Sequence, residues 1–164
     1  MIPKEIRRTQ RIREGDPLEI FTTADGEVIF KKYSPMGELM LFAEQYAEVL
    51  QKNIGHTVLI CDRDTIIAAV GSAKREFCER RISIPLEKIM DGRKMFCYTG
   101  AAAECVFPCE GTSKHILLAC PIVEAGDVAG VVLLATDDRD AKPDPQTQKI
   151  VQIAAAFLAK QVEQ

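Results

Sequence analysis

The chain has 164 residues, of which 47% are hydrophobic and 27% are charged, and its net charge is −3. This composition is typical of one soluble globular domain or of two small ones, and it excludes a collagen-like or wholly disordered chain. No apolar run approaches the ~20 residues of a membrane-spanning helix, and the charged N-terminus lacks the apolar segment of a signal peptide. We therefore expect a cytoplasmic protein without a membrane partner, whose six cysteines are reduced thiols.

The charge is distributed unevenly along the chain. Residues 1–33 carry seven Lys and Arg against six Asp and Glu, whereas residues 34–164 carry 14 against 18. Within the first part, five cations and one acid fall inside ten residues: Lys4, Arg7, Arg8, Arg11, Arg13 and Glu5. A short basic cluster on an otherwise acidic chain is typical of an anion-binding face.

Residues 1–33 are predicted to form a helix and a β-hairpin. Pro3 suits the first turn of a helix that would end near Gln10, and Asp25-Gly26 predicts a tight turn between strands 18–21 and 27–30. On a helix, Lys4, Arg7, Arg8 and Arg11 lie on one face. Because this segment is shorter than the ~40 residues that a self-sufficient core needs, we expect it to dock on the rest of the chain or on a second copy of itself.

Residues 34–164 predict an α+β fold, an antiparallel sheet with helices on one side. The expected elements are a helix from Ser34-Pro35 to Asn53 ended by Gly55, strands 57–61 and 65–70, helices 74–80 and 84–90, an irregular stretch 93–114, strands 116–123 and 128–136, and a helix from Asp144-Pro145 to Val162.

The two long helices carry apolar residues on more than one face. The surplus residues are Leu39, Phe42, Tyr46 and Val49 on the first helix, and Ile150 and Phe157 on the last. A monomer would leave them in water, and a patch of that size is rare on a monomer. We therefore expect these helices to pack together and against a second chain, which gives a homodimer or a homotetramer.

Several motifs resemble known families. The segments IPKEIRR (2–8), EGDPLEI (14–20) and DGEVI (25–29) resemble the AbrB-type swapped-hairpin DNA-binding domain, and LICDRD (59–64), CPIV (120–123) and GVV (130–132) are similar to a GAF domain. The stage V sporulation protein T family of transcription regulators joins these two domains in this order, and FLAKQVEQ (157–164) resembles its C-terminal end.

This resemblance implies a DNA-binding regulator of sporulation genes. Its AbrB-type domain would occupy residues 1–33 and contact DNA, of AT-rich promoters, through Lys4, Arg7, Arg8 and Arg11. Its GAF domain would occupy residues 34–164 and sense a small ligand, mediate oligomerisation, or do both. Family members have a further strand before the IPKEIRR segment, so we expect the first domain to be N-terminally incomplete. A GAF module that binds ligand or assembles without binding DNA is the alternative.

The cysteines leave a third class of function open, a thiol-based redox sensor or enzyme. Cys97, Cys105, Cys109 and His115 match the spacing of a zinc site only loosely, and Cys61, Cys78 and Cys120 are expected in the core. The cysteine signature of the GAF-type methionine sulfoxide reductases and the cyclic-nucleotide signature are both absent. We therefore expect neither catalysis, nor a metal, nor another cofactor. A pocket is expected between residues 93–114 and the sheet.

Overall fold

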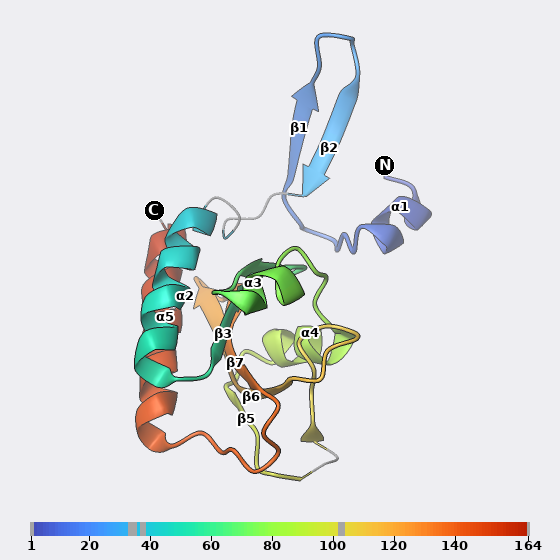
Figure 1. The fold of residues 1–164 in the computed structure, drawn as a ribbon. Coiled ribbons are helices and arrows are strands. Elements are labelled where there is room, and N and C mark those ends of the chain that lie inside the picture. The colour runs from blue at the N-terminus through green and yellow to red at the C-terminus, as the bar shows by residue number, and fades with distance from the viewer. Residues whose placement is uncertain (1, 33–35, 37–38, 102–103, 164) are drawn as a thin grey trace. The chain divides into compact units, whose positions relative to one another are not determined.

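The computed structural model describes residues 2–32, 36, 39–101 and 104–163. The chain divides into two compact units, Met1–Ser34 and Pro35–Gln164. Figure 1 shows the helices and strands of both units.

The first unit consists of a short helix and a hairpin, as predicted. Helix α1 spans Lys4–Thr9, and strands β1 (Leu18–Thr22) and β2 (Val28–Lys32) pair antiparallel with Ile20 opposite Phe30. Gly26 has a φ of 88° at the turn, which confirms the predicted hairpin. The segment after α1 is held to β2, because Lys32 Nζ donates to the Arg11 carbonyl oxygen at 3.0 Å and lies 3.7 Å from the Asp16 carboxylate.

The second unit is built on a five-stranded antiparallel sheet with the order β4-β3-β7-β6-β5. Its strands are β3 (Thr57–Cys61), β4 (Ile66–Ala68), β5 (Phe96–Cys97), β6 (His115–Glu124) and β7 (Asp127–Thr136). The short strand β5 lies within the stretch that was predicted to be irregular. The two long strands form a hairpin at the centre of the sheet, and nearly all of their residues are buried whichever face they point to.

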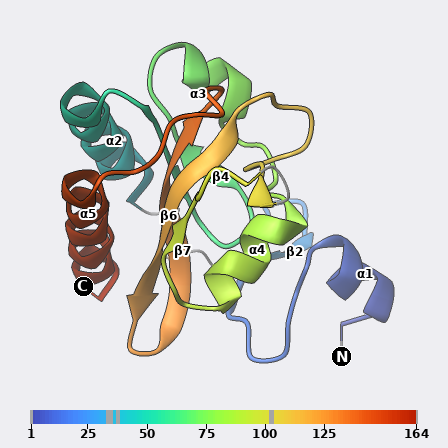
Figure 2. The ribbon, with the colours of Figure 1, turned by 90° about the horizontal axis from the view of Figure 1, so that it is seen from below.

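Helices cover both faces of this sheet, so the prediction of helices on one side is wrong. Helices α2 (Met40–Ile54) and α5 (Pro145–Glu163) lie on one side, and α3 (Ser72–Phe77) and α4 (Ile84–Asp91) on the other (Figure 2). The physical reason is the continuous apolar run of β6 and β7, which exposes apolar side chains on both faces of the sheet unless both are covered. The α+β class itself is confirmed.

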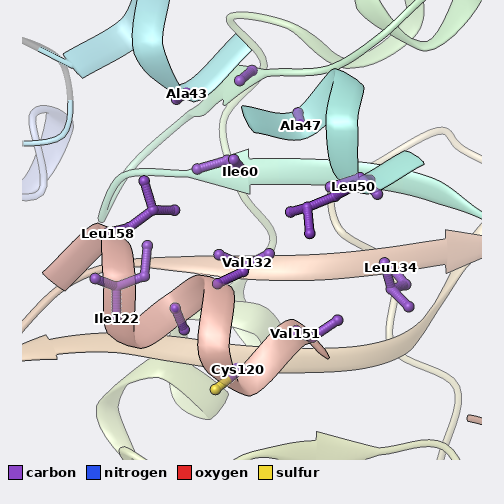
Figure 3. Close-up of a cluster of buried hydrophobic side chains, with 14 of the residues drawn as sticks. Ala43, Ala47, Leu50, Ile60, Cys120, Ile122, Val132, Leu134, Val151 and Leu158 are labelled. Carbon is purple, nitrogen blue, oxygen red and sulfur yellow. The ribbon is translucent and has the colours of Figure 1, made fainter. Parts of the chain in front are cut away.

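The larger core lies between the sheet and the pair α2 and α5 (Figure 3). Small side chains allow both helices to approach the strands closely, namely Ala43 and Ala47 on α2 and Ala154 and Ala155 on α5. Branched residues of the strands fill the space beneath them, among them Ile60, Ile122, Val132 and Leu134.

The helix ends match the prediction unevenly. Gly55, with a φ of 84°, ends α2 as expected, and the Asp144 carboxylate accepts the Thr147 backbone N–H at 2.6 Å, which confirms the cap of α5. Helix α2 begins at Met40, later than predicted, and the expected cap at Ser34-Pro35 lies outside the described residues. Helix α3 ends at Phe77, because Cys78 is extended and Glu79 has a φ of 68°.

One buried polar side chain of the second unit has ring nitrogens without a hydrogen-bond partner among the described residues. His115 is 0% exposed, and neither of its ring nitrogens has a hydrogen-bond partner among the described residues. Its ring lies 4.5 Å from that of Tyr98, centroid to centroid. Burial, and then the positive charge of Arg139, lower the pKa of His115, while Asp137 and Asp138 act weakly in the opposite direction.

Replacement of Gly130 by alanine is expected to destabilise the second unit by about 1–3 kcal/mol. An added Cβ would lie 2.1 Å from the Cys61 carbonyl oxygen of the neighbouring strand, and this backbone atom cannot move without disturbing the pairing of β3 with β7. The measurement is the denaturant midpoint. Gly92→Ala is the control, because its added Cβ would meet nothing closer than 3.4 Å; equal midpoints for both variants would contradict the prediction.

Stability should fall as the pH decreases from about 7.5 to 5.5, and His115→Leu should reduce that fall. The pKa of His115 is lower in the folded chain than its ordinary value near 6.5, so the unfolded chain binds the proton first and acid favours unfolding. Denaturant titrations at several pH values measure the effect. A variant whose stability changes with pH as steeply as that of the wild type would show that His115 does not cause it.

Candidate functional site

The basic cluster of the first unit forms an exposed cationic face on α1. Arg7 and Arg8 follow Lys4 by three and four residues, which places the three side chains on one side of the helix. All three are exposed, and none forms an ion pair with a residue that the structure describes. Arg7 and Arg8 lie in the last turn, where positive charge interacts favourably with the helix dipole. The face can therefore receive an anionic ligand without first breaking an ion pair.

Arg11 does not continue this helical face, which corrects the sequence-based prediction. Helix α1 ends at Thr9, and Arg11 has a φ of 54°, in the left-handed region. Its N–H donates to the Arg8 carbonyl oxygen at 3.3 Å, and the Ile12 N–H donates to the Arg7 carbonyl oxygen at 2.7 Å. These bonds turn the chain away from the helix axis, so Arg11 lies on the connection that follows the helix. No turn-forming residue at positions 9–12 signals this reversal.

The hairpin of the first unit exposes apolar side chains on both of its faces. Ile20 and Phe30, which are paired, are 64% and 61% exposed, and Phe21 and Ile29, paired on the opposite face, are also exposed. Helix α1 contains no buried residue. An isolated two-stranded hairpin is marginally stable in water. The first unit therefore lacks a hydrophobic core of its own among its described residues.

A second apolar surface runs along α2 and α5. The Phe157 ring lies 6.0 Å from Phe42 and 5.6 Å from Tyr46, which confirms that the two helices pack together. Phe42 and Tyr46 are half-buried by these contacts, and Leu39 is half-buried as well. The expectation that all three lie in water is therefore wrong. Val49 is 58% exposed, as predicted. We call Phe42, Tyr46, Val49, Ile153 and Phe157 the helical stripe.

The residues weighed as a loose zinc site do not come together. Cys97 and Cys105 pack against the core beneath α2 and α5, whereas Cys109 belongs to the core on the opposite face of the sheet. Among the described residues, no three Cys, His, Asp or Glu side chains are arranged to hold a metal ion. All six cysteines are free thiols. Cys61 and Cys120 are buried in the core as predicted, and Cys78 is half-buried.

No helix in the described part of the chain has both the length and the apolar character needed to cross a membrane.

Two family models together span most of the chain. The model described as stage V sporulation protein T C-terminal, transcription factor, matches residues 38–163. The model described as antidote-toxin recognition MazE, bacterial antitoxin, matches residues 1–37. Stage V sporulation protein T of Bacillus subtilis (strain 168) is 46% identical over 164 residues, which are 100% of this chain and 91% of that protein.

Solved structures with the same fold are distant in sequence. A GAF domain of a phosphoenolpyruvate-protein phosphotransferase from Coxiella burnetii has a TM-score of 0.60 at 13% identity, covering 76% of this chain and 82% of its own. The type II free methionine-R-sulfoxide reductase of Thermoplasma acidophilum has a TM-score of 0.59 at 11% identity, covering 78% and 95%. The GAF domain of the nutrient sensor CodY from Clostridium difficile has a TM-score of 0.53 at 12% identity, covering 97% of both chains.

At these identities, the solved structures establish the GAF fold and no activity. The family is established by the sequence, because one family model covers more than half of the chain and a relative matches it from end to end. The chain belongs to the stage V sporulation protein T family of transcription factors.

Proposed function

We propose that the first unit binds promoter DNA through the cationic face of α1, with Lys4, Arg7 and Arg8 on the helix and Arg11 on the connection after it. The observation that carries this proposal is the group of three exposed cations that form no ion pair with any described residue. Membership of the family makes the chain a DNA-binding regulator of sporulation with a GAF domain. The proposal adds the residues that make the contact.

The chemistry of these side chains suits both parts of a DNA interface. Lysine and arginine neutralise phosphates, which supplies most of the affinity and makes it depend on salt. Arginine also donates a pair of hydrogen bonds to the major-groove edge of guanine. The family resemblance favours AT-rich promoters, in which arginine side chains also fit the narrow minor groove. Arg11 does not share the helical face of Arg7 and Arg8, so it would contact a different part of the duplex.

The exposed apolar hairpin supports binding as a dimer. Burial of one large apolar side chain is worth ~1.5–3 kcal/mol, and Ile20, Phe21, Ile29 and Phe30 are all exposed in the single chain. A second copy of the same hairpin would cover them around a two-fold axis. Two copies present two cationic faces to one duplex, which raises the affinity through the number of phosphates neutralised.

The helical stripe supports a second contact between chains. Val49, Ile153 and Phe157 are 58%, 57% and 44% exposed, and they lie beside Phe42 and Tyr46 in one apolar surface. Paired with its copy, the stripe forms a bundle of four helices. Two separate two-fold contacts that join each chain to two different partners yield a homotetramer. A single contact, or two contacts that join the same two chains, yields a homodimer. The GAF unit would also take a small ligand in a pocket beside residues 93–114. We do not expect catalysis from this chain.

The double variant Arg7→Ala and Arg8→Ala should bind promoter DNA more weakly and with less dependence on salt. Each lost phosphate contact lowers the slope of log K against log salt by about one unit. The measurement is a titration of labelled AT-rich promoter DNA at several salt concentrations. The matched control is Lys94→Ala with Lys149→Ala, which removes the same charge from exposed positions of the second unit. If both variants bind alike, the net charge and not the α1 face governs the affinity.

Val49→Glu should reduce the oligomeric state of the full chain while both units stay folded. A carboxylate at this exposed position disfavours burial of the helical stripe and leaves the core beneath α2 untouched. Light scattering at micromolar concentration measures the mass. Gln152→Glu is the control, because it adds a carboxylate to α5 away from the stripe. A wild-type chain with the mass of a monomer, or a Val49→Glu variant with the wild-type mass, would contradict the contact.

A further inference from the structure

Four reactive side chains from three separate segments meet beside the core, and neither DNA binding nor assembly uses them. Arg139 Nη1 donates to Cys105 Sγ at 2.7 Å, and the Tyr98 hydroxyl donates to the Arg139 carbonyl oxygen at 3.4 Å. The Tyr98 ring lies against His115 on its other side, at 4.5 Å between centroids. Tyr98 therefore connects the buried imidazole with the thiol and its guanidinium.

Cys105 differs from the other five thiols in its surroundings. Burial raises the pKa of Cys61, Cys78, Cys97 and Cys120, which keeps these groups protonated. Cys109 also accepts from a guanidinium, that of Arg80 at 3.7 Å, but its side chain is only 2% exposed. Cys105 is the thiol that combines partial exposure with a guanidinium nitrogen within 3 Å.

The guanidinium of Arg139 is positioned to act on the sulfur. Its charge forms no ion pair with a carboxylate among the described residues, and its other contact is the face of the Phe107 ring at 5.8 Å. A cation beside sulfur stabilises the thiolate, which is the form that attacks oxidants and electrophiles. Among the described residues, the guanidinium of Arg139 therefore contacts the Cys105 sulfur and the Phe107 ring, and no carboxylate.

His115 is an independent sign that this cluster is built for a polar partner. A buried polar group without a hydrogen bond costs about 1–3 kcal/mol, and most such groups in native proteins have a specific reason. A neutral imidazole offers one donor and one acceptor, and both are unused among the described residues. A polar atom that reached the His115 ring would therefore find a donor and an acceptor without displacing an existing hydrogen bond.

We propose that Cys105 is a site of oxidation by hydroperoxides, activated by Arg139. The sulfur attacks one oxygen of the peroxide, so that an S–O bond forms and the O–O bond breaks. The sulfur loses two electrons and becomes a sulfenic acid, and the peroxide is reduced to water or an alcohol. The proton of the thiol ends on the leaving oxygen, so one thiol and one peroxide give one sulfenic acid and one hydroxyl compound.

Arg139 connects the modified sulfur with the segment that precedes α5 in the GAF unit. Arg139 lies in the connection between β7, which ends at Thr136, and α5, which begins at Pro145. Oxidation adds an oxygen to the Cys105 sulfur, the atom that accepts the hydrogen bond from Arg139 of this connection. The chemical state of Cys105 is thereby transmitted to the segment that leads into α5.

The test compares the oxidation of all six thiols within the full chain. The reduced protein is treated with one equivalent of hydrogen peroxide in the presence of dimedone, which traps sulfenic acid, and each cysteine-containing peptide is quantified by mass spectrometry. We expect Cys105 to be labelled about tenfold faster than Cys97, which is also half-buried but has no guanidinium contact. Equal labelling of Cys105 and Cys97 would overturn the proposal.

Variants separate activation by Arg139 from simple exposure of Cys105. Arg139→Gln should slow the labelling of Cys105 by about tenfold, whereas Arg139→Lys, which keeps the charge, should restore most of it. Arg80→Gln is the matched control, because it removes the guanidinium beside Cys109 and should leave Cys105 unchanged. Faster labelling of all six thiols would show that a variant has unfolded. In that case the proposal is tested by the comparison of Cys105 with Cys97 in the wild type. An Arg139→Gln variant that is folded and labelled at the wild-type rate would overturn the role of the arginine.

Discussion

The burial of the central strands on both faces is the constraint on which the second unit depends. Strands β6 and β7 place apolar side chains above and below the sheet, so a layer of helices is needed on each side. Close packing then selects small residues where backbones approach each other. Two features follow from this requirement. They are the alanines of α2 and α5 and the glycine at position 130, where an added Cβ would collide with the carbonyl of Cys61.

The same constraint explains why α2 and α5 keep an apolar outer surface. The inner faces of the two helices, with Ala43 and Val151 among the buried residues, already cover this side of the sheet. The aromatic contact of Phe42 and Tyr46 with Phe157 joins the two helices but leaves its outer side open. A helix that buries one face needs an apolar stripe of only about 100°. The additional apolar residues are those that the proposed contact between chains would bury.

Local signals in the sequence predict the elements well, because they depend on near neighbours. The turn at Asp25-Gly26, the cap at Asp144 and the end of α2 at Gly55 each depend on the conformational preference of one or two residues. The exposed cations of α1 follow from helical spacing. The departure of Arg11 from that face was not predictable, because hydrogen bonds to Arg7 and Arg8 determine it and no residue there favours a left-handed conformation.

Properties that depend on contacts between distant segments were predicted least well. The unbroken apolar runs 116–123 and 128–136 indicate that both faces of the sheet are covered, but the packing of α3 and α4 against the sheet is what identifies the second layer. Likewise, Cys105 and Arg139 are 34 residues apart, and Tyr98 and Arg139 are 41 apart. Spacing along the chain suggested grouping Cys105 with Cys97 and Cys109, whereas the sheet places it beside an arginine that follows β7.

The two apolar surfaces, one in each unit, constrain how this chain can assemble. In the proposed assembly each surface makes a two-fold contact with its own copy. The hairpin and the helical stripe would then either join the same two chains or join each chain to two different ones. When both contacts join the same two chains, formation of one makes the other intramolecular, with an effective concentration in the millimolar range for a short connection. The stretch between Lys32 and Leu39 spans at most about 25 Å when extended. Assembly of the GAF units and pairing of the DNA-binding units would then be linked, and the coupling is reciprocal: each contact strengthens the other by the same factor.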